Sequence, residues 1–168
     1  MPGSGVVLRQ AATPEDMRTA RELFLEYAAW LKVDLCFQGF DEELATLPGK
    51  YAPPQGRLLI ASVAGEPAGC IALRPLEPGI GEVKRLYVRP AFRGRGIAKK
   101  LSEELLAAAR AIGYAHLRLD TLAFMHEAAT LYRALGFVET AAYYHNPLQG
   151  VVYMELDLRP PPDGVRAR

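Results

Sequence analysis

Apolar side chains recur every three or four residues in the first part of the chain, the spacing of one face of a helix. The stripe follows Thr13 and Pro14, which favour a helix start because threonine can cap a free N–H and proline is tolerated in the first turn. We therefore predict a helix from about Thr13 to about Cys36. Its apolar face comprises Met17, Ala20, Phe24, Tyr27 and Leu31.

Shorter apolar runs follow an irregular segment at 37–54, which we expect to contain a short helix near 41–47. Runs at 58–64 and 67–74, separated by Gly65 and Glu66, predict a hairpin of two strands, and a third strand is expected at 80–88. Helical spacing returns at 97–112, before Gly113, and at 128–135, before Gly136. The remaining strands are expected at 116–120, 138–144 and 151–158.

Helices interspersed among strands predict an α/β or α+β fold, in which helices pack on a mixed sheet. The chain has 168 residues, half of them apolar, which suits one domain with its own core. We expect this single domain to span residues 1–158. Residues 159–168 are proline-rich and lack periodicity, so a disordered tail is expected there.

Charge and cysteine content narrow the function classes. The formal net charge is +1, which gives no overall field for binding nucleic acid or a membrane surface. No apolar run approaches the roughly 20 residues of a membrane-spanning helix. The two cysteines, Cys36 and Cys70, form no CxxC pair and no secretion signal precedes them, so a cytoplasmic protein is expected. No metal site is predicted.

A glycine-rich turn at 93–98 lies between a predicted strand and a predicted helix. Gly94 and Gly96 let backbone N–H groups converge at the positive end of that helix, which is a geometry that binds phosphate. The Walker pattern is absent, and Lys99 stands where the dinucleotide fingerprint needs its third glycine. Nucleotide hydrolysis and hydride transfer are therefore not indicated.

Arg93, Gly96 and Ala98 match the acetyl-CoA signature of the GNAT N-acetyltransferase superfamily, and residues 131–137 resemble its second signature. The resemblance implies a mixed, mostly antiparallel central sheet with helices on both faces, and acetyl-CoA as cosubstrate. It also implies that strand residues pair with the pantetheine arm while the turn holds the pyrophosphate. The cofactor-binding residues would be Leu86, Tyr87, Val88, Arg93, Gly94, Arg95, Gly96, Ile97, Ala98 and Lys99.

The same resemblance assigns catalytic roles. Tyr132 matches the family's tyrosine that protonates the departing sulfur, and a phenol stays protonated near neutral pH. Glu82 resembles the glutamate that some members use as general base, while His126, His145 or water are the alternatives. Met125 stands where many relatives carry an asparagine that contacts the cofactor, so the resemblance does not supply that contact here, and the neighbouring His126 is the alternative for it.

The acceptor site in this family is built from the first helix, the loop after it and the late strands. That places Tyr27, Trp30, Gln38, Tyr144 and Asn146 there, together with Phe37, Tyr51, Tyr143 and His145. These aromatic walls favour a small molecule or an amino acid with a primary amine. A protein N-terminal or lysine acetyltransferase and a non-catalytic acyl-CoA-binding regulator remain alternatives. The resemblance also leaves open a homodimer paired through the late strands.

Overall fold

The computed structural model describes residues 5–35 and 38–160. Its first helix, α1 (Pro14–Leu31), begins where predicted. Thr13 Oγ1 accepts the N–H of Asp16 at 3.1 Å, and the Asp16 carboxylate accepts the N–H of Thr13, which is a capping box. The predicted end near Cys36 is wrong, because Lys32 adopts a left-handed conformation with a φ of 57° and ends the helix. Cys36 itself lies outside the described residues.

A seven-stranded sheet forms the centre, in the order β1-β2-β3-β4-β5-β7-β6. Neighbouring strands are antiparallel except β4 and β5, which are parallel, so the predicted mixed and mostly antiparallel sheet is confirmed. The strands are β1 (Val6–Gln10), β2 (Arg57–Val63), β3 (Glu66–Glu77), β4 (Ile80–Val88), β5 (His116–Leu122), β6 (Val138–Thr140) and β7 (Val151–Asp157).

Strand β1 is not predicted from the sequence. It is five residues long, none of its residues is fully buried, and it pairs on one side only, with β2. An edge strand of this kind needs little apolar patterning, since its backbone hydrogen bonds hold it in place.

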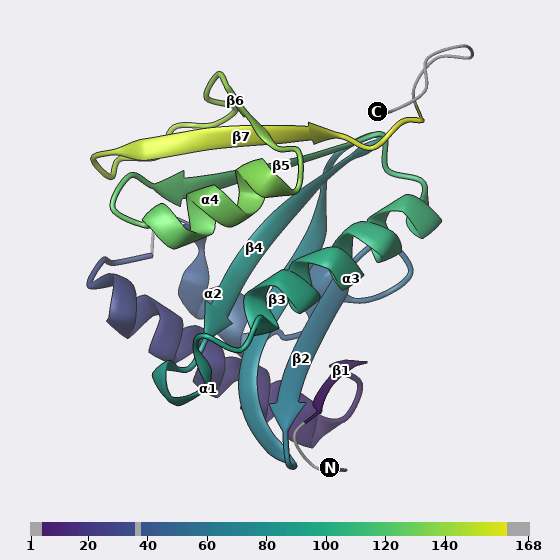
Figure 1. Cartoon of the computed structure of the whole chain (residues 1–168), viewed down its shortest axis with the longest axis vertical. Coiled ribbons are helices and arrows are strands. Elements are labelled where there is room, and N and C mark those ends of the chain that lie inside the picture. The colour runs from purple at the N-terminus through teal and green to yellow at the C-terminus, as the bar shows by residue number, and fades with distance from the viewer. Residues whose placement is uncertain (1–4, 36–37, 161–168) are drawn as a thin grey trace.

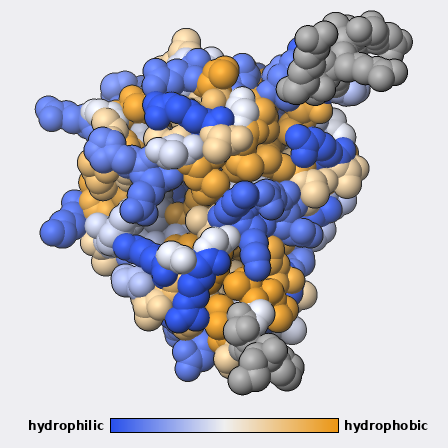
Figure 2. Space-filling model, viewed as in Figure 1, coloured by the Kyte–Doolittle hydropathy of each residue, from blue (hydrophilic) through white to orange (hydrophobic). Residues whose placement is uncertain are grey.

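The helices cover both faces of the sheet, as predicted. Helices α3 (Ile97–Ile112) and α4 (His126–Ala134) lie on the near face in Figure 1, and α1 and α2 (Phe40–Ala45) lie on the far face. Each layer has its own core. Leu101, Leu105 and Ile71 belong to one, and Phe24, Leu58 and Ile60 belong to the other. Figure 2 shows hydrophilic residues along α3 and hydrophobic residues to either side of it.

Helix α3 has the predicted bounds, and Gly113 ends it with a φ of 106°. The short helix expected near 41–47 is α2, which is followed by a 3₁₀ turn at Gly49–Tyr51. Among the described residues there is no helix with the length and hydropathy to span a bilayer.

Strands β4 and β5 stay together only where they begin. Their backbone pairing runs from Ile80 opposite His116 to Glu82 opposite Arg118 and then stops. On the other side of β4 the register with β3 shifts, and Arg85 takes up a φ of 63°, which marks a bulge. The carboxyl halves of two adjacent strands therefore diverge. The smaller of the two clefts described below lies between them, and the larger one opens at the end of β4.

The predicted strand at 138–144 is too long, because β6 ends at Thr140. Beyond it the chain leaves the sheet and turns toward β4 and β5. Tyr143 and Tyr144 then bond to Glu82 and Asp120, two carboxylates on those strands. Side-chain hydrogen bonds, rather than backbone hydrogen bonds to a neighbouring strand, hold the segment around Tyr143 and Tyr144 in place.

Candidate active site

The larger of two adjoining clefts lies between the end of β4, the glycine-rich turn and the start of α4, with a volume of about 480 Å³. Eight of the ten predicted cofactor-binding residues line it: Leu86, Tyr87, Val88, Arg93, Gly94, Gly96, Ile97 and Ala98. The other two, Arg95 and Lys99, do not line it. The Arg95 guanidinium lies 5.5 Å from the Phe92 ring centroid, and Lys99 pairs with Glu103 at 3.8 Å on the solvent side of α3.

The turn itself has the backbone of an anion site. Gly94 and Gly96 have φ values of 80° and 75°, a conformation that glycine adopts at no steric cost. Gly96 precedes the first turn of α3 and no side chain caps it, so the first N–H groups of the helix have no side-chain partner there, and Gly96, Ile97 and Ala98 line the cleft. A pyrophosphate placed there would meet these donors and the positive end of the helix dipole.

Arg93 stands at the rim of this cleft and is fixed by three contacts. Its Nε donates to the carbonyl of Val88 at 2.9 Å. Its guanidinium lies 5.0 Å from the Trp30 ring centroid and 5.9 Å from that of Tyr87. The structure thus places Trp30, expected in the acceptor site, on the larger cleft beside the cofactor-binding residues.

The smaller cleft is a narrow pocket of about 50 Å³ deeper between β4 and β5. It shares Leu86, Met125 and Ala128 with the larger cleft, so the two adjoin. Three residues expected in the acceptor site line it, namely Tyr27, Gln38 and Asn146. Its polar wall also includes Lys84, Arg85, Asp120 and Thr121.

Tyr132 lies on α4 and lines the small pocket close to the residues that both clefts share. Only 7% of it is exposed, and its ring centroid is 5.5 Å from that of Phe137. Burial raises the pKa of Tyr132 above its usual value of 10.0, with smaller contributions from Tyr27 and Asp120. The phenol therefore keeps its proton at neutral pH and can donate it.

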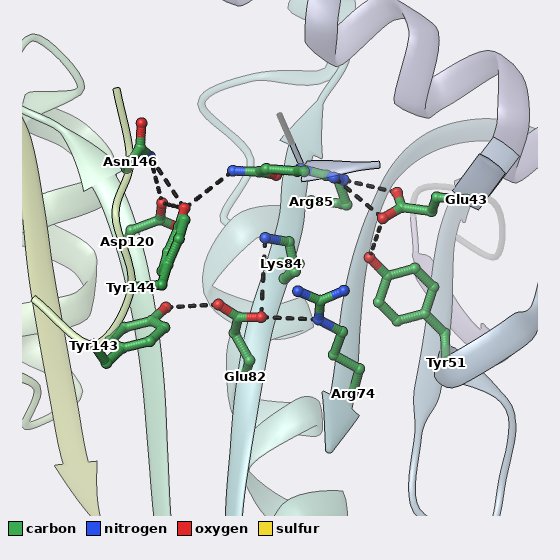
Figure 3. A network of polar contacts seen from close by, with 11 residues as sticks. Glu43, Tyr51, Arg74, Glu82, Lys84, Arg85, Asp120, Tyr143, Tyr144 and Asn146 are labelled. Carbon is green, nitrogen blue, oxygen red and sulfur yellow. Dashed lines mark hydrogen bonds and ion pairs between the residues drawn. The ribbon is translucent and has the colours of Figure 1, made fainter. Parts of the chain in front are cut away.

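Glu82, the predicted base, is 1% exposed and does not line the small pocket. Its Oε1 accepts from Arg74 Nε at 2.8 Å and lies 3.9 Å from Lys84 Nζ, while its Oε2 accepts from the Tyr143 hydroxyl at 2.7 Å. Figure 3 shows the row Tyr143, Glu82 and Arg74, with Lys84 above it. Glu82 is therefore a buried carboxylate that accepts a hydrogen bond on each oxygen.

Asp120 is a site residue that the sequence did not indicate. It sits on β5 facing the small pocket, and it accepts hydrogen bonds from the Tyr144 hydroxyl and, at 2.8 Å, from Asn146 Nδ2 (Figure 3). Gln38 Nε2 donates to the same tyrosine oxygen at 3.2 Å. Gln38, Tyr144 and Asn146 are thus brought together around Asp120, although 106 residues separate the first two. In the strand pattern, Asp120 is an ordinary solvent-facing position.

Lys84 is the other unexpected group in the pocket wall. It is 6% exposed, and burial lowers its pKa to about 8, although the neighbouring Glu82 opposes that shift. Of the two histidines considered as bases, His126 lines the larger cleft, while His145 is exposed and lines neither. Phe37 lies outside the described residues. Within the described part of the chain, no group of three histidine, cysteine or acidic side chains could hold a metal ion.

Comparisons with known proteins agree with this geometry. Residues 17–137 match the model of the acetyltransferase (GNAT) family. An uncharacterized N-acetyltransferase of Schizosaccharomyces pombe is 39% identical over 160 residues, covering 94% of this chain and 98% of the relative. The crystal structure of a putative acyl-CoA N-acyltransferase from Klebsiella pneumoniae is 30% identical, with a TM-score of 0.72 over 93% of this chain and 99% of that one.

Solved structures with bound cofactor share the fold. The PaiA N-acetyltransferase of Thermoplasma acidophilum, in complex with coenzyme A, is 20% identical, with a TM-score of 0.69 over 91% of this chain and 99% of that one. With a family match over most of its length and a relative aligned along nearly all of it, the chain belongs to the GNAT family of N-acetyltransferases, which use acetyl-CoA.

Proposed function

We propose that this enzyme moves the acetyl group of acetyl-CoA to a primary amine of a small molecule or an amino acid, by direct attack of the amine on the thioester. The observation that carries the proposal is the position of Tyr132. It lines a polar pocket that adjoins the larger cleft through three shared residues. A thioester lying at that junction would place its sulfur near a buried, protonated phenol.

The larger cleft supports the donor side of the proposal. Its glycine-rich turn offers uncapped N–H groups for the pyrophosphate, and Val88 and Leu86 lie along the wall that leads to Tyr132. Trp30 and Phe124, 41% and 56% exposed, add apolar surface at the cleft. Arg95 and Lys99 do not line the cleft, so for them we propose only a general electrostatic contribution.

The narrow pocket supports a small acceptor group over a bulky one. A volume of about 50 Å³ exceeds the roughly 10–15 Å³ that a cavity needs to hold one water but is well below the roughly 150 Å³ of a cavity that binds benzene. A protein amine on an unbranched carbon, such as that of a lysine side chain, would also fit such a pocket by its amine alone, so a protein acceptor is the second candidate. The non-catalytic alternative is less well supported, because a regulator has no need of Tyr132 at this junction.

The test is thiol release from acetyl-CoA across a panel of alkyl and aryl amines, amino acids and short peptides, with Tyr132→Phe beside the wild type. A general acid contributes about 10²–10⁴-fold, so the variant should lose at least 100-fold in kcat while its KM for acetyl-CoA stays within about twofold. Tyr114→Phe is the matched control, because the Tyr114 hydroxyl donates to the carbonyl of Gln55, far from both clefts. Coenzyme A binding without thiol release to any acceptor would favour the regulator.

A further inference from the structure

The two diverging strands each carry a carboxylate, and their hydrogen bonds differ. Glu82 on β4 uses both oxygens: Oε1 accepts from Arg74 and Oε2 accepts from Tyr143. It is almost fully buried and is outside the pocket lining. A substrate amine that enters the pocket would therefore not meet this carboxylate directly.

Asp120 on β5 is held by one oxygen. The Tyr144 hydroxyl and Asn146 Nδ2 both donate to Oδ2, and among the described residues no donor contacts Oδ1. Asp120 is half-buried and lines the pocket. A carboxylate offers about four acceptor positions, so a side chain fixed at one oxygen still has room for an ammonium on the other.

Asp120 and Tyr132 line the same narrow pocket. That shared lining gives the pocket an anionic group to hold a nitrogen and an acid to meet a leaving sulfur. A pocket of about 50 Å³ holds a small group, which favours an aminomethyl group over a nitrogen or neighbouring carbon with an additional substituent. Lys84, a cation in the same wall, makes a bound ammonium more acidic, because like charges disfavour the protonated form.

We propose, building on the acetyl transfer proposed above, that Asp120 holds the acceptor's ammonium and takes its proton, and that the acceptor is an unbranched primary amine. Tyr144 and Asn146 are positioning residues in this arrangement, since they fix the carboxylate that meets the substrate. Gln38 fixes Tyr144 in turn.

The protons and electrons balance as follows. The ammonium gives one proton to Asp120, which later releases it to solvent. The nitrogen lone pair forms the C–N bond, the C–S bond breaks, and the sulfur leaves with the bonding pair and takes the phenolic proton of Tyr132. The second proton of the new amide nitrogen restores the Tyr132 hydroxyl. One proton is released per turnover, and no further reactant is needed.

The deciding experiment compares Asp120→Asn with Glu82→Gln, using the best primary amine from the panel together with its N-methyl and α-methyl derivatives. Asp120→Asn should lower kcat/KM for the amine at least 100-fold while the KM for acetyl-CoA stays within about twofold. Folded Glu82→Gln should keep more activity than Asp120→Asn. Asp157→Asn makes the same change at a remote carboxylate paired with Arg159 and should have no effect.

Two further readouts separate chemistry from structural damage. Formate should restore activity to Asp120→Ala by about tenfold, because a free carboxylate can replace the missing proton acceptor. Wild-type enzyme should prefer the unbranched amine to both methylated derivatives by at least tenfold. Coenzyme A binding confirms that each variant is folded.

Each result of these experiments would overturn a different part of the proposal. If wild-type enzyme acetylates no amine, the proposed function fails, and the role of Asp120 fails with it. If wild-type enzyme is active but Asp120→Asn stays within threefold of it, or Glu82→Gln alone abolishes turnover in a folded protein, only the role of Asp120 is overturned. Equal rates with the methylated derivatives would overturn the substrate class.

Discussion

Arg85 and Glu43 form a two-point ion pair between the bulge of β4 and helix α2. Arg85 Nε lies 2.9 Å from Glu43 Oε2, and Nη2 lies 3.1 Å from Oε1. The side chains are 3% and 11% exposed, and Arg85 Nη1 also donates to Gln38 at 2.9 Å. The pair therefore ties α2 and the residues near Gln38 to the wall of the small pocket.

Glu43→Gln should destabilise the protein strongly. The substitution leaves a buried guanidinium without its counter-charge, which typically costs 3–5 kcal/mol in the free energy of unfolding. Denaturant titration measures this loss in the free energy of unfolding. Glu42→Gln changes an exposed neighbour on the same helix and should stay within about 0.5 kcal/mol of wild type. Similar small losses in both variants would show that the ion pair contributes little.

Gly96→Ala should weaken coenzyme A binding about tenfold or more. A side chain at a φ of 75° costs about 1–2 kcal/mol, and relief of that strain would turn the N–H groups of the turn away from the pyrophosphate. Gly79→Ala is a matched control, because Gly79 has a φ of 77° and equally open surroundings but lies outside both clefts. Calorimetric titration should show unchanged affinity in this control despite a similar loss of stability.

Asp16 should make stability depend on acid pH. Burial alone would raise its pKa, but hydrogen bonds from the N–H groups of Ala12 and Thr13, and the nearby Arg9, lower it to about 2 from 3.8. The stabilisation is therefore complete above pH 3.8 and is lost as the pH falls toward 2.

Asp16→Asn should accordingly be less stable than wild type by about 1 kcal/mol at neutral pH, as for other lost helix caps. The difference should shrink between pH 3.8 and 2, measured by denaturant midpoints. Glu15→Gln, at an exposed neighbouring position, should show no such trend. A difference that stays constant down to pH 2 would contradict the role of the Asp16 charge.

Lys84 should make stability depend on alkaline pH, with the same sign as Asp16, because the unfolded chain again holds its proton to a higher pH than the folded protein. The folded protein releases this proton near pH 8 and the unfolded chain near 10.5, so wild-type stability should rise between those values. Lys84→Met removes the cost of burying the charge and should be more stable than wild type at pH 7, with an advantage that declines toward pH 10.5. Thermal unfolding of both proteins between pH 7 and 10.5 measures this difference in stability. Lys99→Met, at an exposed site, should show a flat difference.

Local patterns in the sequence were sufficient for most elements of the fold. The 97–112 helix and the 80–88 strand have the predicted bounds, because their apolar periodicity and flanking glycines act within a few residues. Strand β1 and the end of β6 could not be predicted. The first depends on backbone pairing with a strand about 50 residues away, and the second depends on tyrosine side chains that leave the sheet to bond carboxylates on other strands.

The residues of the candidate site likewise fall into those that local sequence patterns predict and those that depend on the tertiary structure. The sequence by itself determined the glycine-rich turn and the position of Tyr132 on its helix, since glycine conformation, helix start and helix face are local properties. Only the tertiary structure decided which carboxylate faces the small pocket. Glu82 and Asp120 are both acidic residues on strands, and side chains from other elements set them apart. Arg74 on β3 and Tyr143 after β6 occupy both oxygens of the buried Glu82, whereas Tyr144 and Asn146 occupy one oxygen of Asp120.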